Sequence, residues 1–254
     1  MFAAIYIMWL RHLKRYFRSR ARIVASLGQP LLFLVALGYG MNGIYRQARG
    51  QDYTVFLTPG IVAMSILFTA TFSGIELLWD RQFGFLKETL VAPVPRIAIM
   101  IGRTLGGATV ATFQGLIVIA ICMLAPHGFR PANLMLLPVA LLFMILIGVL
   151  FTAFGNAVGS VLEDFQGFQL VMNFIIMPIF FLSGALFPLD PNTTPKPLLW
   201  IARVNPLAYG VDGLRNVLIN QPTHFGLTVD LCVLPAVAAA MVCIGAYLFS
   251  RIQL

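Results

Sequence analysis

Apolar stretches of about twenty residues recur along this chain from end to end, and each is long enough to cross the ~30 Å hydrocarbon core of a bilayer as a helix. The composition points the same way, because 59% of the 254 residues are hydrophobic, only 10% are charged, and the mean hydropathy is +0.89. A soluble domain carries about a quarter of its residues as charged side chains. The sequence therefore predicts an all-α polytopic membrane protein and excludes a soluble fold.

Six of these stretches are predicted to be transmembrane helices, within one domain that covers residues 1–254. Residues 1–22 precede them as an amphipathic helix, with Trp9 and Leu13 on its apolar face and Arg11 and Arg15 on the other. Such a helix lies in the membrane interface. The predicted spans are 23–44, 57–79, 104–125, 134–160, 168–188 and 231–250.

Two pairs of glycines, Gly102/Gly106 and Gly155/Gly159, have the spacing of small residues at helix contacts in membranes. They are read either as sites of tight helix packing or as hinges.

The distribution of Lys and Arg predicts the orientation in the membrane. With the N-terminus in the cytoplasm, the cytoplasmic segments hold 11 of the 17 basic residues, and six of these precede the first span. The chain is therefore expected to have both termini in the cytoplasm. The net charge of +8 does not predict a nucleic-acid partner, because the basic residues cluster beside spans, where orientation and anionic lipid account for them.

The segment 189–230 is apolar enough to suggest a seventh span, but it carries Arg203, Asp212 and Arg215. Three charges at the centre of a span would oppose insertion by about 7–10 kcal/mol. We therefore expect two short external re-entrant helices that meet at Asn205-Pro206. In the second of these, Tyr209, Asp212 and Arg215 share one face, so Asp212 can pair with Arg215 and Tyr209 can cap the polar patch.

No motif for catalysis or cofactor binding occurs in the sequence, which lacks GxxxxGK[ST], HExxH, CxxC and GxSxG. The three cysteines lie in or at spans and the three histidines are far apart, so neither a metal site nor a disulfide is predicted. Glu76 is the only acid plainly within a span. Its carboxylate either reaches the cytoplasmic headgroups or contacts a transport pathway or a second subunit. The sequence thus predicts a protein that is not an enzyme and binds no cofactor.

The charged segment 80–103, between the second and third predicted spans, is the candidate contact with a partner. Residues Arg81–Val91 can form a helix, in which Phe83, Leu86 and Leu90 share one face, before Pro93 ends it. Such a helix either lies on lipid or docks into a groove of a cytoplasmic partner. The periodicity alone does not separate these two interpretations.

Four strings in this chain resemble the permease (transmembrane) subunit of the type-2 ABC exporter family, the class of drug-resistance, lipo-oligosaccharide and polysaccharide exporters. They are FLTPGIVAM (56–64), LKETLVAPVPR (86–96), PIFFLSGALFPL (178–189) and NPLAYGVDGLR (205–215). The likeness runs over essentially the full length. One departure is the opening of the loop, DRQFGFLKE, which lacks the doubled acidic-basic start common in relatives.

The resemblance implies a homodimer of permeases in the bacterial inner membrane, working with two copies of a separate ABC ATP-binding subunit that holds ATP and Mg. The segment 80–103 would be the coupling loop, with a short cytoplasmic coupling helix in the groove of the ATPase. The external helices would close the outer mouth. The residues implied in coupling are Arg81, Phe83, Phe85, Leu86 and Glu88, and those implied in the gate are Asn205, Pro206, Tyr209, Asp212 and Arg215.

Three functions are compatible with this sequence. The resemblance favours an ATP-driven exporter of an amphipathic, drug-like, lipid-like or lipo-oligosaccharide substrate. An ion-gradient-driven secondary transporter is the alternative, although Glu76 is the only candidate for an intramembrane ionisable group. A scaffold or channel subunit without transport activity is the third.

Overall fold

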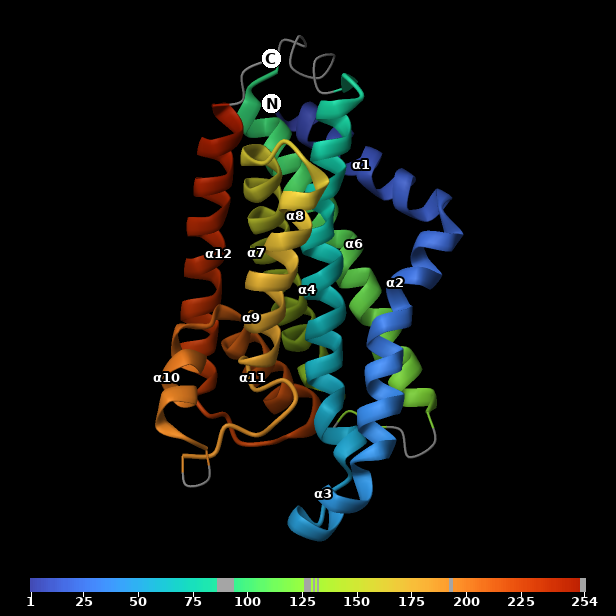
Figure 1. Cartoon of the computed structure of the whole chain (residues 1–254), viewed down its shortest axis with the longest axis vertical. Helices are drawn as coiled ribbons and strands as arrows, with labels where there is room; N and C mark the ends of the chain where they lie inside the picture. The colour runs from blue at the N-terminus through green and yellow to red at the C-terminus, as the bar shows by residue number, and fades with distance from the viewer. Residues whose placement is uncertain (86–93, 126–128, 130, 132, 192–193, 252–254) are drawn as a thin grey trace.

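The computed structural model describes the whole chain apart from residues 86–93, 126–128, 130, 132, 192–193 and 252–254. Every regular element in the part so described is helical, which confirms the all-α class (Figure 1). In chain order the elements are α1 (Phe2–Arg18), α2 (Arg20–Phe33), the π-helix η1 (Leu34–Tyr39), α3 (Asn42–Arg49), α4 (Tyr53–Gln82), α6 (Arg96–Leu124), the 3₁₀-helix η2 (Leu134–Leu136), α7 (Leu137–Val161), α8 (Phe165–Val171), the π-helix η3 (Met172–Ile176), α9 (Met177–Phe181), α10 (Lys196–Val204), α11 (Pro206–Ile219) and α12 (Leu227–Ser250).

Four of the described helices, α4, α6, α7 and α12, are long and apolar enough to cross a membrane. A fifth crossing is counted if α1 and residues 23–39 form one broken span, although the two parts bend by 74° at their junction. The segment Phe165–Phe181, made of α8, η3 and α9, is apolar but shorter. The structure thus has several apolar helices of membrane-spanning length, and the number six stays a prediction.

Helix α4 forms the centre of the bundle, and 83% of its most apolar stretch is buried inside the protein (Figure 1). It reaches this position through close contact with α7. A Cβ atom on Gly74 would lie 2.1 Å from the carbonyl oxygen of Gly155, and one on Gly159 would lie 2.6 Å from the carbonyl oxygen of Gly74. Because glycine alone lacks that atom, the two backbones touch, as small residues allow in membrane bundles.

The first predicted span, 23–44, is divided in the structure. Helix α2 contains Pro30, which has no N–H group to donate within the helix. The backbone then changes to the π-helix η1, and α3 begins after a break at Met41. A proline inside a helix and a π-segment are both common causes of such irregularity.

The predicted loop 80–103 is shorter than expected. Helix α4 continues through Asp80 to Gln82, and α6 begins at Arg96 rather than at 104. Hydropathy assigned these charged residues to a loop because it scores each residue alone. The ends of α4 and α6 can be buried because Asp80 and Arg103 neutralise each other inside the protein.

The far end of the bundle, opposite the start of α1, carries α3, α10 and α11 (Figure 1). Two short helices were expected to meet at Asn205-Pro206, and the structure has α10 and α11 there. Asn205 caps α11, since its side-chain oxygen accepts a hydrogen bond from the Leu207 amide at 3.0 Å, and Pro206 is the first residue of the helix. Most of α11 is buried, against α4, α7 and α12.

Candidate functional site

A buried ion pair closes the base of the segment 80–103. Nη1 of Arg103, in the second turn of α6, lies 2.7 Å from Oδ2 of Asp80, in the last turn of α4, and the side chains are 1% and 3% exposed. A charge that is nearly out of water is stable only when paired. The two helix ends that flank the segment are therefore held together by a short charge-assisted hydrogen bond.

Helix α1 binds to the same pair through its basic face. Nη2 of Arg11 lies 3.3 Å from Oδ1 of Asp80, while Arg15 lies 3.6 Å from that oxygen and 3.4 Å from Oε2 of Glu76. Nδ1 of His12 lies 3.2 Å from the same Glu76 oxygen. These five side chains and Arg103 form a group that we call the basal ion cluster: Arg11, His12, Arg15, Glu76, Asp80 and Arg103.

The contact between α1 and α6 depends on the glycine pair Gly102/Gly106. A Cβ on Gly102 would lie 2.8 Å from the carbonyl oxygen of Ile5, and one on Gly106 would lie 2.7 Å from Cβ of His12. The Nε1 atom of Trp9 also donates a hydrogen bond to Thr109 at 3.1 Å. Helix α1 is thus packed tightly on α6 as well as bonded to α4, which favours the packing interpretation of this pair over the hinge.

The five residues implied in coupling are placed differently from one another. Arg81 is bonded within the chain, to the Leu162 carbonyl at 3.3 Å and to Glu163 at 2.9 Å. Phe83 and Phe85 are 70% and 49% exposed. Leu86 and Glu88 lie outside the described residues.

The helix expected from Arg81 to Val91 does not start at Arg81. Arg81 and Gln82 belong to α4, and the chain then turns at Gly84, where φ is +79°. Glycine adopts this left-handed conformation without steric cost. Phe85, the last described residue before the gap, is helical again.

Glu76 contacts α1 instead of standing alone in a span. Its carboxylate accepts from Arg15 and lies beside His12. Sequence patterns do not single out Arg11, His12, Arg15, Asp80 or Arg103 as site residues. The opposite charges of Asp80 and Arg103, at the two ends of the segment 80–103, are the one feature of the sequence that hints at this pair. Residues 23 positions apart share no local periodicity from which their contact could be predicted.

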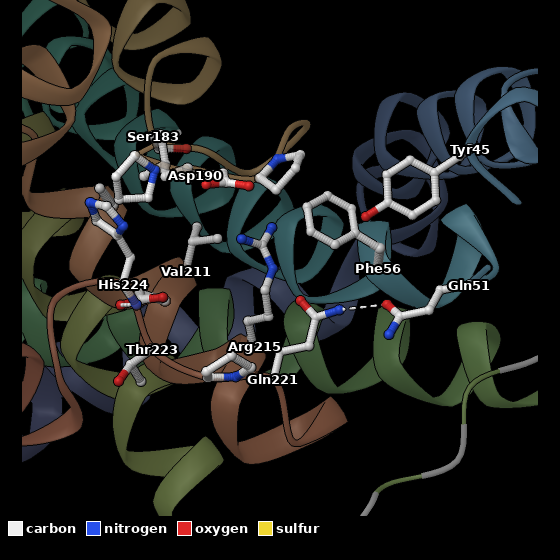
Figure 2. Close-up of a pocket in the computed structure, with 16 residues that line it drawn as sticks. Tyr45, Gln51, Phe56, Ser183, Asp190, Val211, Arg215, Gln221, Thr223 and His224 are labelled. Carbon is white, nitrogen blue, oxygen red and sulfur yellow. Dashed lines mark hydrogen bonds between the residues drawn. The ribbon is translucent and has the colours of Figure 1, made fainter. Parts of the chain in front are cut away.

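A second polar site lies at the far end of the bundle, where a cavity of about 730 Å³ opens beside α11. Its lining includes Tyr45, Phe56, Asp190, Asp212, Arg215 and His224 (Figure 2). Arg215 reaches into the middle of this lining, with its guanidinium carbon 4.1 Å from the centre of the Phe56 ring. Burial lowers the pKa of Arg215 to about 10, so its side chain is still charged at neutral pH.

Arg215 and Asp212 do not pair with each other as expected. Nη2 of Arg215 donates to the carbonyl oxygen of Gly184 at 2.9 Å, which holds the turn after α9 against α11. Asp212 accepts from the amides of His224 and Phe225 at 2.7 and 2.9 Å. Each side chain therefore fixes a different loop to α11, because backbone groups of the two loops lie closer than the opposite charge.

Two other predicted gate residues fix the ends of α10 and α11. The hydroxyl of Tyr209 donates to the Arg203 carbonyl at 2.6 Å, and its ring stacks on Phe225 with centroids 4.5 Å apart. Nδ2 of Asn205 donates to the Ile179 carbonyl at 2.6 Å. Within the described ranges, no group of three or more His, Cys, Asp or Glu side chains is arranged to hold a metal ion.

Comparison with known proteins identifies the family. The family model described as ABC-2 type transporter matches residues 3–219. Nodulation protein J of Rhizobium leguminosarum bv. viciae is 28% identical over 222 residues, which are 85% of this chain and 83% of that protein. The inner membrane transport permease YadH of Escherichia coli (strain K12) is 26% identical over 84% of this chain and 81% of its own length. The putative transport permease ycf38 of Porphyra purpurea is 27% identical over 82% and 71%. This chain therefore belongs to the ABC-2 type transporter family and is a membrane transport permease.

Proposed function

We propose that this chain is the permease subunit of an ATP-driven exporter, that it acts as a homodimer, and that a separate ATP-binding subunit hydrolyses the ATP. The cargo is an amphipathic, drug-like, lipid-like or lipo-oligosaccharide molecule taken from the cytoplasm or the inner leaflet. Membership of the ABC-2 family supports the subunit arrangement, because such permeases normally pair with an ATP-binding subunit. The name of YadH, an inner membrane transport permease, supports transport across an inner membrane, and the name of ycf38 supports transport.

The observation that carries the coupling step is the buried bond between Asp80 and Arg103. A force applied to the segment between them reaches α4 and α6 together, because the pair prevents the two helix ends from separating. The basal ion cluster passes the same movement to α1, through Arg11 and Arg15. In this mechanism the ATPase subunit holds the segment through exposed groups such as Phe83 and Phe85.

The outer end closes through α10 and α11. Arg215 and Asp212 connect α11 to the turn at Gly184 and to the loop at His224, so these parts move with α11 as one body. Since α11 also packs against α4, a displacement of α4 at the coupling end is transmitted to the external cavity. We infer that α11 is the moving part of the outer gate.

The test is to reconstitute the chain with an ATPase subunit encoded beside it and to measure ATP hydrolysis and export in the same vesicles. The double variant Phe83→Ala/Glu88→Ala is expected to assemble normally but to lose the stimulation of ATP hydrolysis by substrate. Phe2→Ala is the matched control, since Phe2 is also a strongly exposed phenylalanine, at 88% exposed, on a different segment. Normal coupling in the double variant would reject the proposed contact, and proton-driven uptake by the chain without any ATPase would reject the exporter.

A further inference from the structure

A cavity of about 400 Å³ lies inside a single copy of the chain, between the bend that joins α1 to α2 and one face of α4. Helix α6 closes its inner side with Gly107 and Val110. The cavity borders the basal ion cluster, because His12 and Glu76 belong to both. None of the described residues of the proposed coupling contact or the outer gate lines it.

One wall of this cavity is apolar and largely aromatic. Phe68, Phe72, Ile75 and Trp79 follow one another on the face of α4. Phe72 and Trp79 are 40% and 43% exposed, so their rings are free to contact a molecule that enters. An aromatic wall of this kind can bind the apolar part of a ligand, as in most ligand pockets.

The polar part of the lining, on α2 and on another side of α4, offers mostly hydrogen-bond acceptors. The Ser26 hydroxyl donates to the Ile23 carbonyl at 3.0 Å, and the Ser73 hydroxyl donates to the Ala70 carbonyl at 2.7 Å. A hydroxyl has one hydrogen, so each oxygen presents only its lone pairs to the cavity. The Glu76 carboxylate is a further acceptor, and Gln29 adds an amide. These four groups are complementary to O–H and N–H groups, and only the Gln29 amide among them offers hydrogen atoms to a phosphate or carboxylate oxygen.

The charges around the cavity also disfavour a cation. Glu76 is already bonded to Arg15 and lies 3.2 Å from His12. The basal ion cluster as a whole holds three arginines against two carboxylates, so the field that it adds is not negative. An ammonium group would gain no unpaired carboxylate here.

We propose that this cavity binds an amphipathic molecule whose head group is uncharged and carries hydroxyl or amide donors. The head lies against Ser26, Ser73 and Glu76, and the apolar part lies along Phe68 and Phe72. The identification of this ligand as the exported cargo rests on the proposed function, whereas binding itself does not.

The experiment measures protection of a single cysteine in the full-length chain, held in lipid nanodiscs without ATPase or nucleotide. The background replaces Cys122, Cys232 and Cys243 with serine, and Thr69→Cys, at a lining residue that the proposal does not use for binding, reports on the cavity. Decyl glucoside, decyl phosphate and decyltrimethylammonium share one tail and differ in the charge of the head. Decyl glucoside is expected to slow the reaction of the cysteine with a maleimide saturably, by about tenfold at about nine times its Kd, while the two charged probes give little protection.

Two controls separate binding from simple partition into the bilayer. Val24→Cys is next to Ala25 in α2 but does not line the cavity and is 70% exposed, so it should show no protection. Filling the cavity with Ala25→Trp should abolish protection at Thr69→Cys, whereas Val24→Trp should not. Equal protection by all three probes, equal protection at Val24→Cys, or none at all would overturn the proposal. If export by the reconstituted complex persists in that case, the proposed function stands and this site alone is wrong.

Discussion

Arg103 and Asp80 form a bond of 2.7 Å between side chains that are 1% and 3% exposed. The bond joins the last turn of α4 to the second turn of α6 and so closes the segment between them at its base. Two further arginines of α1, Arg11 and Arg15, approach the same carboxylate.

Arg103→Leu is expected to lower the free energy of unfolding by about 3 kcal/mol, at the lower end of the range for breaking a buried pair, since Arg11 and Arg15 still compensate Asp80 in part. The double variant Asp80→Asn/Arg103→Leu should be more stable than Arg103→Leu, because it leaves no buried charge unpaired. Unfolding followed by tryptophan fluorescence in detergent measures both. Arg46→Leu is the control, since Arg46 is 66% exposed and 3.7 Å from Asp52, and should cost less than about 1 kcal/mol. If the free energy of unfolding fell equally in Arg103→Leu, in the double variant and in Arg46→Leu, the buried pair would have no special role in stability.

Gly106→Ala is expected to displace α1 from α6. The new methyl group would lie 2.7 Å from Cβ of His12, and overpacking of this kind costs about 1–3 kcal/mol. Amide hydrogen exchange in residues 2–18 should become faster, because the helix loses its support. Gly28→Ala has nothing within 4 Å of the added atom and should leave exchange unchanged. Unaltered protection of α1 in Gly106→Ala would show that the contact is not needed to hold the helix.

Arg215→Met is expected to loosen the outer end of the bundle. The Gly184 carbonyl would lose its donor, at a cost of about 1–3 kcal/mol for a buried unpaired group. Vesicles that contain the variant should leak a small fluorescent solute when no ATP is present, while the amount of folded protein stays comparable. Arg203→Met, on exposed α10, is the matched control and should remain tight. If vesicles that contain Arg215→Met do not leak the solute, the result would argue against a gate at this position.

Both ends of the chain are expected in the cytoplasm. Nη1 of Arg96, at the start of α6, donates to the carbonyl of Ser250 at 2.6 Å, so the ends of α4 and α12 and the start of α6 share one end of the bundle. Fusions of alkaline phosphatase after residue 254 should therefore be inactive, whereas a fusion in the external segment, after Gln221, should be active. Alkaline phosphatase activity of the fusion after residue 254 would show that the orientation is opposite to the expected one.

Part of the site could be predicted from the sequence. Asn205-Pro206 was recognised as the junction of two helices, because an N-cap residue followed by proline is a local signal. The pairing of Asp212 with Arg215 was wrong, although the spacing allows it on an isolated helix. Both side chains are buried, and each is bonded to a backbone group of a loop that is distant in the sequence. These bonds replace the ion pair that the two residues could form on a solvent-exposed helix.

The sequence alone determined the class of this protein, since apolar runs of membrane length can satisfy their backbone only as helices in lipid. It also identified the glycine pairs Gly102/Gly106 and Gly155/Gly159 and the junction at Asn205-Pro206, because their signals are short spacings within the sequence. Only the tertiary structure decided that α1 is bonded to Asp80 and Glu76, that α6 begins at Arg96, and that a cavity opens at the bend after α1. These features depend on side chains that are distant in the chain, 23 residues apart for Asp80 and Arg103 and 61 to 69 for the bonds of α1 to Glu76 and Asp80, and such contacts leave no trace in periodicity or hydropathy.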